Sequence, residues 1–203
     1  MKTATRDKMV VGAMDLISRR GVNATSVREV VRHTNTPRGS IKHYFPNGKL
    51  QLVSEAVLLA GQEVSLPLQQ LVSEYGVIKG LSIFIELWGN ILKKSNFEAG
   101  CSVLAVAAEQ YIGEDGNPQP EAEQLLMEIA DNIFKDWQHT LVIGLEKENV
   151  ESIRATRLAS LIIASIEGTV ALCRAARNVT ALEDVQVEIE LMLQAVIGKI
   201  SIK

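Results

Sequence analysis

Apolar residues recur along this chain at intervals of three and four positions, and no long segment alternates strictly between apolar and polar residues. This spacing places the apolar side chains on one face of an α-helix. The pattern predicts long helices over residues 49–71, 77–95, 100–112, 120–148, 152–177 and 182–202. We expect a bend or an end near Pro67 in the first of them, because proline cannot donate a helical hydrogen bond. The predicted fold class is all-α.

The residues before these long helices predict three shorter ones. An apolar stripe over residues 9–17 forms the first helix, which Gly21 ends as a C-terminal cap. The second begins at Thr25 and Ser26, because Ser26 and the Glu29 that follows it by three residues match a capping box.

A turn at residues 34–37 separates the second helix from the third. Asn35 tolerates a left-handed backbone, and Pro37 suits the first position of a new helix. The third helix is predicted from Arg38 to about Phe45. Two short helices joined by a tight turn, after a longer amphipathic helix, are typical of a helix-turn-helix DNA-binding domain.

Charge is distributed unevenly along the 203 residues. Residues 1–50 hold ten basic and three acidic side chains, a net charge of +7, whereas residues 51–203 hold eleven basic and twenty-one acidic ones, a net charge of -10. A basic N-terminal segment fits a module that binds a polyanion. A chance cluster of solvated charges is the alternative that composition leaves open.

The helix-turn-helix segment resembles the N-terminal domain of the tetracycline-repressor (TetR) family. The resemblance is carried by Ala-Thr-Ser-Val-Arg-Glu-Val-Val at 24–31, Pro-Arg-Gly-Ser-Ile-Lys-His-Tyr-Phe-Pro at 37–46, and Lys49. The glycine at 48 and Gly-Cys-Ser-Val at 100–103 are similar to the LmrA/YxaF branch. The resemblance implies an N-terminal three-helix helix-turn-helix domain and a C-terminal helical bundle for ligand binding and dimerisation.

The resemblance also implies which residues contact DNA. Arg38 and Ser40 are expected at base edges, because a guanidinium can donate two hydrogen bonds to guanine. Lys49 is the expected phosphate clamp, with a mobile ammonium beside the free N–H groups of a helix N-terminus. Ile41 and Phe45 are expected to pack the domain instead. The predicted DNA-binding residues are Thr25, Ser26, Thr36, Arg38, Gly39, Ser40, Lys42, His43, Tyr44 and Lys49.

The expected organisation is a dimer of two-domain chains. Residues 1–48 would form the DNA-binding domain, and residues 49–203 a helical domain for effector binding and dimerisation. Apolar residues cover more of the last two predicted helices than one buried face requires. By resemblance, these helices would pair in a four-helix bundle, and two reading helices would then meet a palindromic operator. Burial inside a monomer is the alternative.

Aromatic pairs indicate a candidate effector pocket. Phe84 and Trp88 lie four residues apart and Phe134 and Trp137 three apart, so each pair shares a helix face. Such faces suit a flat or lipophilic ligand but are also typical of an ordinary core. Glu109 is expected to orient a ligand or to form an ion pair. The predicted lining residues are Phe84, Trp88, Phe97, Cys101, Phe134, Trp137, Ile163 and Glu167.

Other function classes find little support in the sequence. No P-loop, H-E-x-x-H, C-x-x-C or G-x-S-x-G motif occurs, so we expect neither an enzyme nor a metal or cofactor site. No apolar run approaches the roughly 20 residues of a membrane span, and no signal peptide is apparent, which favours a cytoplasmic protein. We expect a dimeric repressor released from its operator by a small lipophilic or aromatic effector. An effector-independent DNA-binding or adaptor protein is the alternative.

Overall fold

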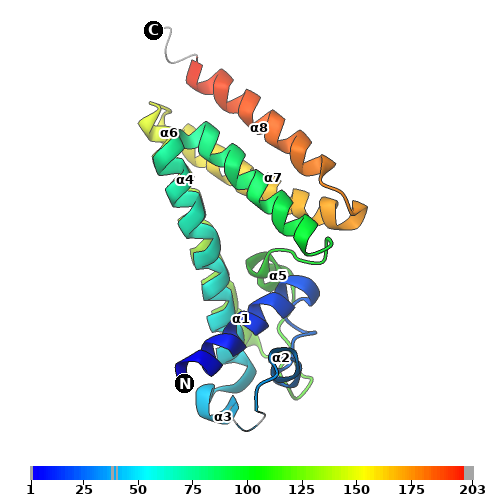
Figure 1. Cartoon of the computed structure of the whole chain (residues 1–203). Helices are drawn as coiled ribbons and strands as arrows, with labels where there is room; N and C mark the ends of the chain where they lie inside the picture. Colours follow the sequence, from blue (N-terminus) through cyan, green and yellow to red (C-terminus); the bar gives the residue numbers. More distant parts are fainter. Residues whose placement is uncertain (1, 38, 40, 199–203) are drawn as a thin grey trace. The chain divides into compact units, whose positions relative to one another are not determined.

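The computed structural model describes residues 2–37, 39 and 41–198, with side chains from Thr5 onward. Its helices are α1 (Lys2–Arg20), α2 (Val27–Thr34), α3 (Ile41–Tyr44), α4 (Gly48–Lys94), α5 (Ser102–Ala108), α6 (Pro120–Lys147), α7 (Ser152–Ala176) and α8 (Thr180–Gly198) (Figure 1). Among the described residues no strand forms, and one isolated β-bridge joins Ile112 and Pro118. The prediction of an all-α fold is confirmed.

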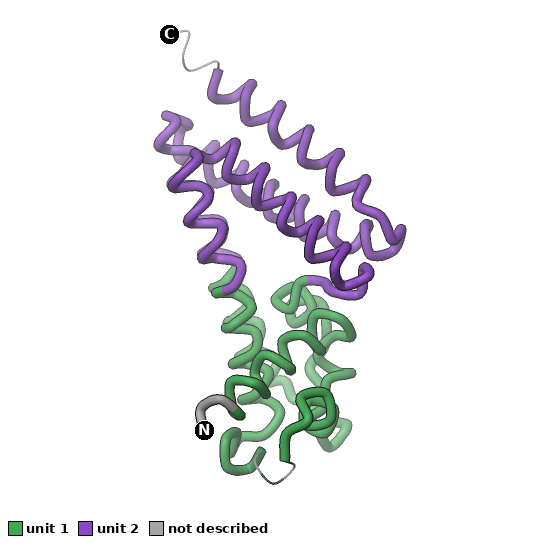
Figure 2. Tube along the Cα trace, viewed as in Figure 1, with its two compact units in different colours: residues 1–62, 101–133 green, residues 63–100, 134–203 purple. Residues whose placement is uncertain are grey.

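The chain divides into two compact units (Figure 2). Unit 1 comprises residues 1–62 and 101–133, which include α1 to α3, the first part of α4, α5 and the first part of α6. Unit 2 comprises residues 63–100 and 134–203, which include the rest of α4 and α6 together with α7 and α8. The helix-turn-helix segment and the residues that follow α5 therefore belong to the same unit.

The core of unit 1 forms where α1 packs against the short helices. Met9, Ala13 and Ile17 on α1 are 0% exposed, as the predicted apolar stripe requires. The helices α1 and α2 approach each other closely at Gly12, where an added Cβ would lie 2.1 Å from Cγ2 of Thr34. This contact leaves no room for a larger residue at that point of α1.

The core of unit 2 lies between α7 and the other long helices. Trp137 and Leu141 on α6 and Ile162 on α7 are at most 1% exposed. The helix α8 buries Leu182, Ile189 and Leu193, and the Gln186 amide donates a hydrogen bond to the Ser82 hydroxyl on α4. Both predicted C-terminal helices thus contribute to the core of their own unit.

Within the described residues, α7 is the one helix whose length and composition would allow it to cross a membrane. Half of the residues in its most apolar window are buried inside the structure. Such burial is typical of the core helix of a globular protein.

The helix α4 continues past the point where the sequence predicts a bend or an end. It does not end near Pro67. It consists of two helices that meet at a kink at Gly76, with φ 77° and ψ 169°, which confirms the predicted division between residues 49–71 and 77–95 (Figure 1). Leu68, next to the proline, is 0% exposed. Its burial offsets part of the cost of the hydrogen bond that proline cannot donate.

Two other predicted helices are shorter in the structure. Residues 100–112 were expected to be helical, but α5 ends at Ala108, because residues 111–119 form a turn with hydrogen bonds of their own. In this turn the N–H of Gly113 donates to the Asn117 carbonyl and that of Gln119 to the Tyr111 carbonyl. The predicted third helix, residues 38–45, appears as α3 at Ile41–Tyr44, and residues 38 and 40 lie outside the described residues.

Gly80→Ala is expected to lower the free energy of unfolding by about 1–3 kcal/mol. An added Cβ would lie 2.6 Å from the Leu71 carbonyl oxygen and 2.8 Å from the Val72 nitrogen, and these backbone atoms cannot rotate away. The matched control is Gly89→Ala, whose Cβ would meet Leu182 at an ordinary 3.7 Å. It should raise stability by about 0.5–1 kcal/mol, because alanine favours the helix. Urea unfolding of both variants measures the difference, and equal effects would contradict the packing described for Gly80.

Candidate nucleic-acid interface

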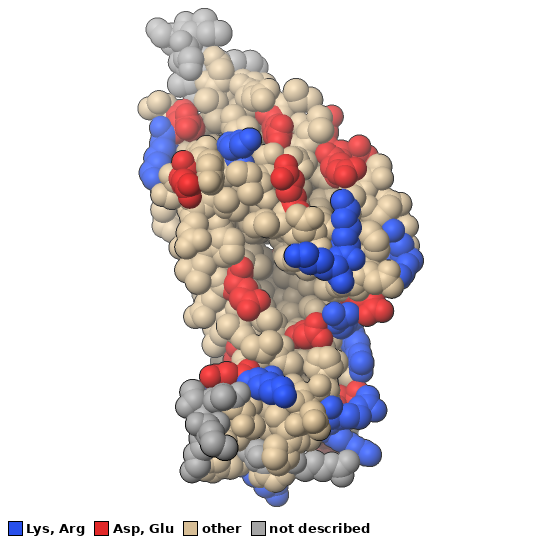
Figure 3. Space-filling view, in the orientation of Figure 1, with Lys and Arg blue, Asp and Glu red and all other residues tan. Residues whose placement is uncertain are grey.

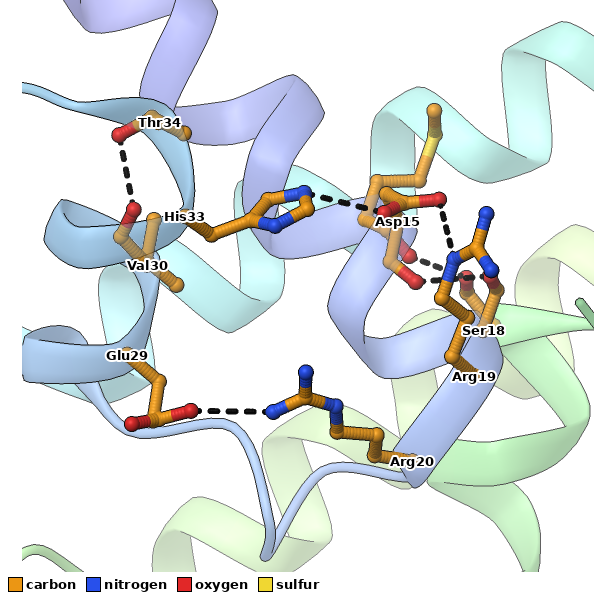
Figure 4. Close-up of polar contacts among 10 residues, drawn as sticks. Asp15, Ser18, Arg19, Arg20, Glu29, Val30, His33 and Thr34 are labelled. Carbon is orange, nitrogen blue, oxygen red and sulfur yellow. Dashed lines mark hydrogen bonds and ion pairs between the residues drawn. The ribbon is translucent and has the colours of Figure 1, made fainter. Parts of the chain in front are cut away.

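The N-terminus of α2 is capped as the sequence predicts. Ser26 has an extended backbone, and its hydroxyl accepts a hydrogen bond from the Glu29 N–H at 3.2 Å. The Glu29 carboxylate makes different contacts from the one a capping box would give. It pairs with Arg20 at 3.0 Å (Figure 4) and with Arg32 at 2.7 Å. Glu29 therefore links the end of α1 to α2.

A second polar contact fixes α2 against α1. The Asp15 carboxylate accepts a hydrogen bond from Nε of Arg19 on its own helix and lies 3.0 Å from Nε2 of His33 on α2 (Figure 4). Together with the Glu29 pairs, this contact holds α2 at two points along its length. On the face shown in Figure 3, Lys and Arg side chains lie over the end of α1 and over α2, and others lie over unit 2.

The turn between α2 and α3 has the predicted left-handed residue. Asn35 has φ 51° and ψ 48°, and the Thr36 N–H donates to the Val31 carbonyl. The hydroxyls of Thr34 and Thr36 share a hydrogen bond of 2.9 Å. The turn that orients α3 thus depends on an asparagine in a position that favours glycine.

The short helix α3 presents polar side chains on one face and packs with the other. Ile41 and Phe45 are 7% and 1% exposed, which confirms their expected packing role. Lys42 and His43 are exposed, and Tyr44 is half-buried with its ring edge-on to the His43 ring at 5.1 Å. Of the other residues predicted for DNA contacts here, Gly39 is exposed, whereas Arg38 and Ser40 lie outside the described residues.

The groove between α2 and α3 includes two charged residues that the sequence analysis did not assign to DNA. Its volume is about 770 Å³, with Arg28 from α2, Lys42 from α3 and Glu114 from the turn after α5 among the residues that line it. Arg28 is signalled in the sequence by its place in the first turn of α2. Glu114 carries no such signal, because it is far away along the chain.

Two side chains predicted to contact phosphate have partners within unit 1. The Lys49 ammonium is not mobile: the residue is 6% exposed, and Nζ donates to the Ile112 carbonyl at 2.9 Å. Burial lowers the pKa of Lys49, and the carboxylates of Glu114 and Glu109 oppose that shift. The Thr25 hydroxyl is also engaged, since it is buried and donates to the Gly21 carbonyl at 2.8 Å. Neither side chain points freely to solvent, although backbone N–H groups in the first turn of α4 have no partner within the helix.

The structure gives Glu109 another role than the expected ligand contact or ion pair. Its carboxylate accepts hydrogen bonds from the backbone N–H groups of Val22 and Asn23, between α1 and α2. These partners are more than eighty residues away along the chain. Helical periodicity contains no signal for such a contact.

The predicted effector-lining residues are divided between the two units. Cys101 belongs to unit 1, where its sulfur caps α5 by accepting a hydrogen bond from the Leu104 N–H. The other seven lie in unit 2, where Phe84, Trp88, Trp137, Ile163 and Glu167 are buried and Phe97 and Phe134 are half-buried.

One predicted aromatic pair is in contact. The rings of Phe134 and Trp137 meet edge to face at 5.3 Å, and the Trp137 indole N–H donates to the Ser65 hydroxyl. A cavity of about 190 Å³ in unit 2 is lined by a different set of residues, from 69–73 on α4 and 136–147 on α6. Within the described residues, no group of three His, Cys, Asp or Glu side chains is placed to hold a metal ion.

Comparison with known proteins decides the family. The family model for bacterial regulatory proteins of the tetR family matches residues 10–56, and the one for the C-terminal domain of LmrA/YxaF-like transcriptional regulators matches residues 77–188. The chain belongs to the TetR family of transcriptional regulators. TetR-family membership confirms the resemblance seen in the helix-turn-helix segment, the LmrA/YxaF branch and the expectation of a regulator rather than an enzyme.

Relatives and solved structures of similar length support this assignment. An uncharacterized HTH-type transcriptional regulator of Mycobacterium tuberculosis is 32% identical over 190 residues, which cover 94% of each chain. The HTH-type regulator LmrA of Bacillus subtilis is 24% identical over 88% of this chain and 90% of its own. A TetR regulator from Legionella pneumophila has the same fold, with a TM-score of 0.76, 21% identity and coverage of 91% of this chain and 95% of that chain.

Proposed function

We propose that this TetR-family regulator is a dimeric repressor that binds a palindromic operator and is released by a small lipophilic or aromatic effector. The observation that carries the DNA-binding part is the geometry of α2 and α3. A capped α2 and a left-handed turn hold a short helix whose Lys42 and His43 are exposed. This arrangement is that of a reading helix supported by its neighbours.

The proposed DNA contacts are those expected from the sequence, with different tasks. Arg38, Gly39, Ser40, His43 and Tyr44 would lie at or near base edges, while Thr25, Ser26, Thr36, Lys42 and Lys49 would lie near the backbone. For Lys49, whose side chain is engaged within unit 1, the proposed phosphate contact falls to backbone N–H groups in the first turn of α4. The hydroxyl and the N–H of Thr25 both donate within unit 1, so its proposed place is near the backbone without a hydrogen bond of its own to phosphate. We take residues 1–48 as the DNA-binding domain and 49–203 as the effector and dimerisation domain.

Lys42→Ala is expected to weaken binding to all DNA sequences alike and to lower the salt slope by about one, because one phosphate contact is lost. Arg38→Ala should instead cost about 1–3 kcal/mol and relax the preference at one base position. The matched control is Lys93→Ala, which removes an exposed lysine from unit 2. Fluorescence anisotropy over a range of salt concentrations measures affinity and slope. Unchanged values for Lys42→Ala and Arg38→Ala would contradict the proposed docking of α3.

Exposed apolar side chains on α7 and α8 support dimerisation through these helices. Leu161 and Leu172 on α7 are 51% and 60% exposed, and Val187 and Leu191 on α8 are 54% and 53% exposed. Each pair lies on one face of its helix by its spacing. Gly168, on the same face of α7, has no atom within 4 Å of an added Cβ, so a second chain could approach closely there. A second copy of this face is its proposed occupant, because symmetric pairing would cover the apolar residues of both copies.

The effector is proposed to bind within unit 2, among the aromatic residues of α4 and α6. The proposed contacts are the predicted residues that belong to unit 2, namely Phe84, Trp88, Phe97, Phe134, Trp137, Ile163 and Glu167, without Cys101 of unit 1. Trp88 and Trp137 are the two tryptophans of the chain, so ligand titration can be followed by their fluorescence. A compound that quenches this emission should also release the operator. Quenching without any change of operator affinity would favour the effector-independent alternative.

We place the protein in the cytoplasm, where its DNA target lies.

A further inference from the structure

Residues 109–112, which follow α5, are hydrogen-bonded to the loop between α1 and α2. The Glu109 carboxylate accepts from the N–H groups of Val22 at 3.2 Å and Asn23 at 3.1 Å. The Asn23 side chain completes the contact from the other side: Nδ2 donates to the Gln110 carbonyl at 2.7 Å, and Oδ1 accepts from the Ile112 N–H at 3.0 Å. Four hydrogen bonds therefore join two loops of unit 1.

The same four residues also hold the start of α4. The Lys49 ammonium donates to the Ile112 carbonyl and lies 5.2 Å from the centre of the Tyr111 ring. Tyr111 is 3% exposed, and burial raises its pKa to about 12, so the ring stays neutral beside the cation. The second residue of α4 is thus anchored to the segment that anchors the α1–α2 loop.

Residues 109–112 are themselves held in place by further contacts within unit 1. The Tyr111 N–H donates to the Glu123 carboxylate at 3.2 Å, and the Ser102 hydroxyl at the start of α5 donates to the Met14 carbonyl of α1. The turn that follows is closed by the bridge between Ile112 and Pro118. Residues 109–112 thus have hydrogen-bonded neighbours before and after them in unit 1. They are therefore suited to hold the α1–α2 loop and the start of α4 at a fixed separation.

The contacts of residues 109–112 lie next to the N-termini of α2 and α4. Asn23 precedes the cap residue Ser26 by only three residues, and Lys49 follows the first residue of α4. The N-termini of α2 and α4 are where helix dipoles and free N–H groups favour phosphate. Their separation must match that of two phosphates if both are to bind.

We propose that residues 109–112 act as a spacer that sets the separation of the N-termini of α2 and α4, and that Glu109 and Asn23 are positioning residues for DNA binding. This inference rests on the proposed docking of the helix-turn-helix segment. Neither residue contacts DNA in the proposal. Their effect is on affinity for the correct duplex, because a misplaced helix N-terminus loses its phosphate while the basic surface still attracts any DNA.

The test compares Glu109→Gln and Asn23→Ala with the control Glu128→Gln, which removes one exposed carboxylate elsewhere in unit 1. In Glu109→Gln the side-chain oxygen can still accept a hydrogen bond from one of the two backbone N–H groups. The NH₂ group would face the other N–H, which then has no acceptor. Binding is measured by anisotropy on a duplex that the unchanged protein selects from random sequences and on a scrambled duplex. Circular dichroism first shows that each variant is folded at the assay temperature.

Glu109→Gln and Asn23→Ala are each expected to bind the selected duplex at least about tenfold more weakly, with a salt slope lower by about one. Binding to the scrambled duplex should change by less than about threefold, and Glu128→Gln should behave as the unchanged protein. The variant that carries both substitutions should bind the selected duplex no more weakly than whichever single variant has the lower affinity for it, since both changes release the same restraint.

Two results would overturn the inference. If both variants melt at a lower temperature but bind the selected duplex with unchanged affinity and slope, residues 109–112 only stabilise unit 1. If the unchanged protein itself does not distinguish the two duplexes, the proposed DNA docking fails, and the spacer role fails with it. Should Asn23→Ala not fold, Glu109→Gln alone carries the comparison with Glu128→Gln.

Discussion

Replacing Leu172 by glutamate is expected to give a monomer whose affinity for a palindromic duplex is lower by about a hundredfold or more. Leu172 is 60% exposed on α7 and lies on the face proposed to pair with its copy. In a symmetric interface the substitution places two carboxylates in one apolar contact, where each loses its hydration. A monomer carries one reading helix, so it cannot gain from binding two half-sites at once.

Ile143→Glu provides the matched control for this substitution. Ile143 is 41% exposed on α6 in the same unit, and it lies outside the faces of α7 and α8 proposed to pair. It should leave the dimer intact. Light scattering coupled to size-exclusion chromatography measures the mass of both variants, and anisotropy measures their affinity for DNA. A dimeric Leu172→Glu variant would contradict pairing through this face.

Gly21→Ala is expected to lower the free energy of unfolding by about 2–5 kcal/mol and to weaken DNA binding. Gly21 has φ +84°, a conformation that costs alanine about 1–2 kcal/mol. An added Cβ would also lie 1.8 Å from Oε1 of Glu109 and 2.7 Å from its Cδ, so the carboxylate must move. Its movement leaves the N–H groups of Val22 and Asn23 without their partner, at an additional cost of about 1–3 kcal/mol.

The matched control is Gly116→Ala, which separates backbone strain from the clash. Gly116 has a similar φ of +82°, and nothing lies within 4 Å of its added Cβ. Urea unfolding should show a smaller loss for this variant, and its DNA affinity should be unchanged. Equal losses for the two variants would mean that the contact with Glu109 contributes nothing beyond strain.

Local signals in the sequence predict the helix-turn-helix segment well. The cap at Ser26, the left-handed Asn35 and the glycine after α1 each depend on neighbouring residues, and the structure shows all three. The packing of Ile41 and Phe45 follows equally from periodicity. Family resemblance then extends these local signals to a function.

Contacts between distant parts of the chain could not be predicted in this way. The burial of Lys49 depends on the Ile112 carbonyl, 63 residues away, and the partners of Glu109 lie 86 and 87 residues away. Periodicity reports which face of a helix is buried, but not what that face meets. For the same reason the sequence assigned Cys101 and the tryptophans to one pocket, whereas they belong to different units.

The most direct test of the central claim is to let the purified protein select DNA from a random pool and to measure its affinity for the selected duplex. Anisotropy at several salt concentrations compares this duplex with a scrambled one of equal length. The account predicts a palindromic sequence, bound about a thousandfold or more tightly than the scrambled duplex, with affinity that falls steeply as salt rises. Failure to enrich any sequence, with equally weak binding to both duplexes, would contradict it.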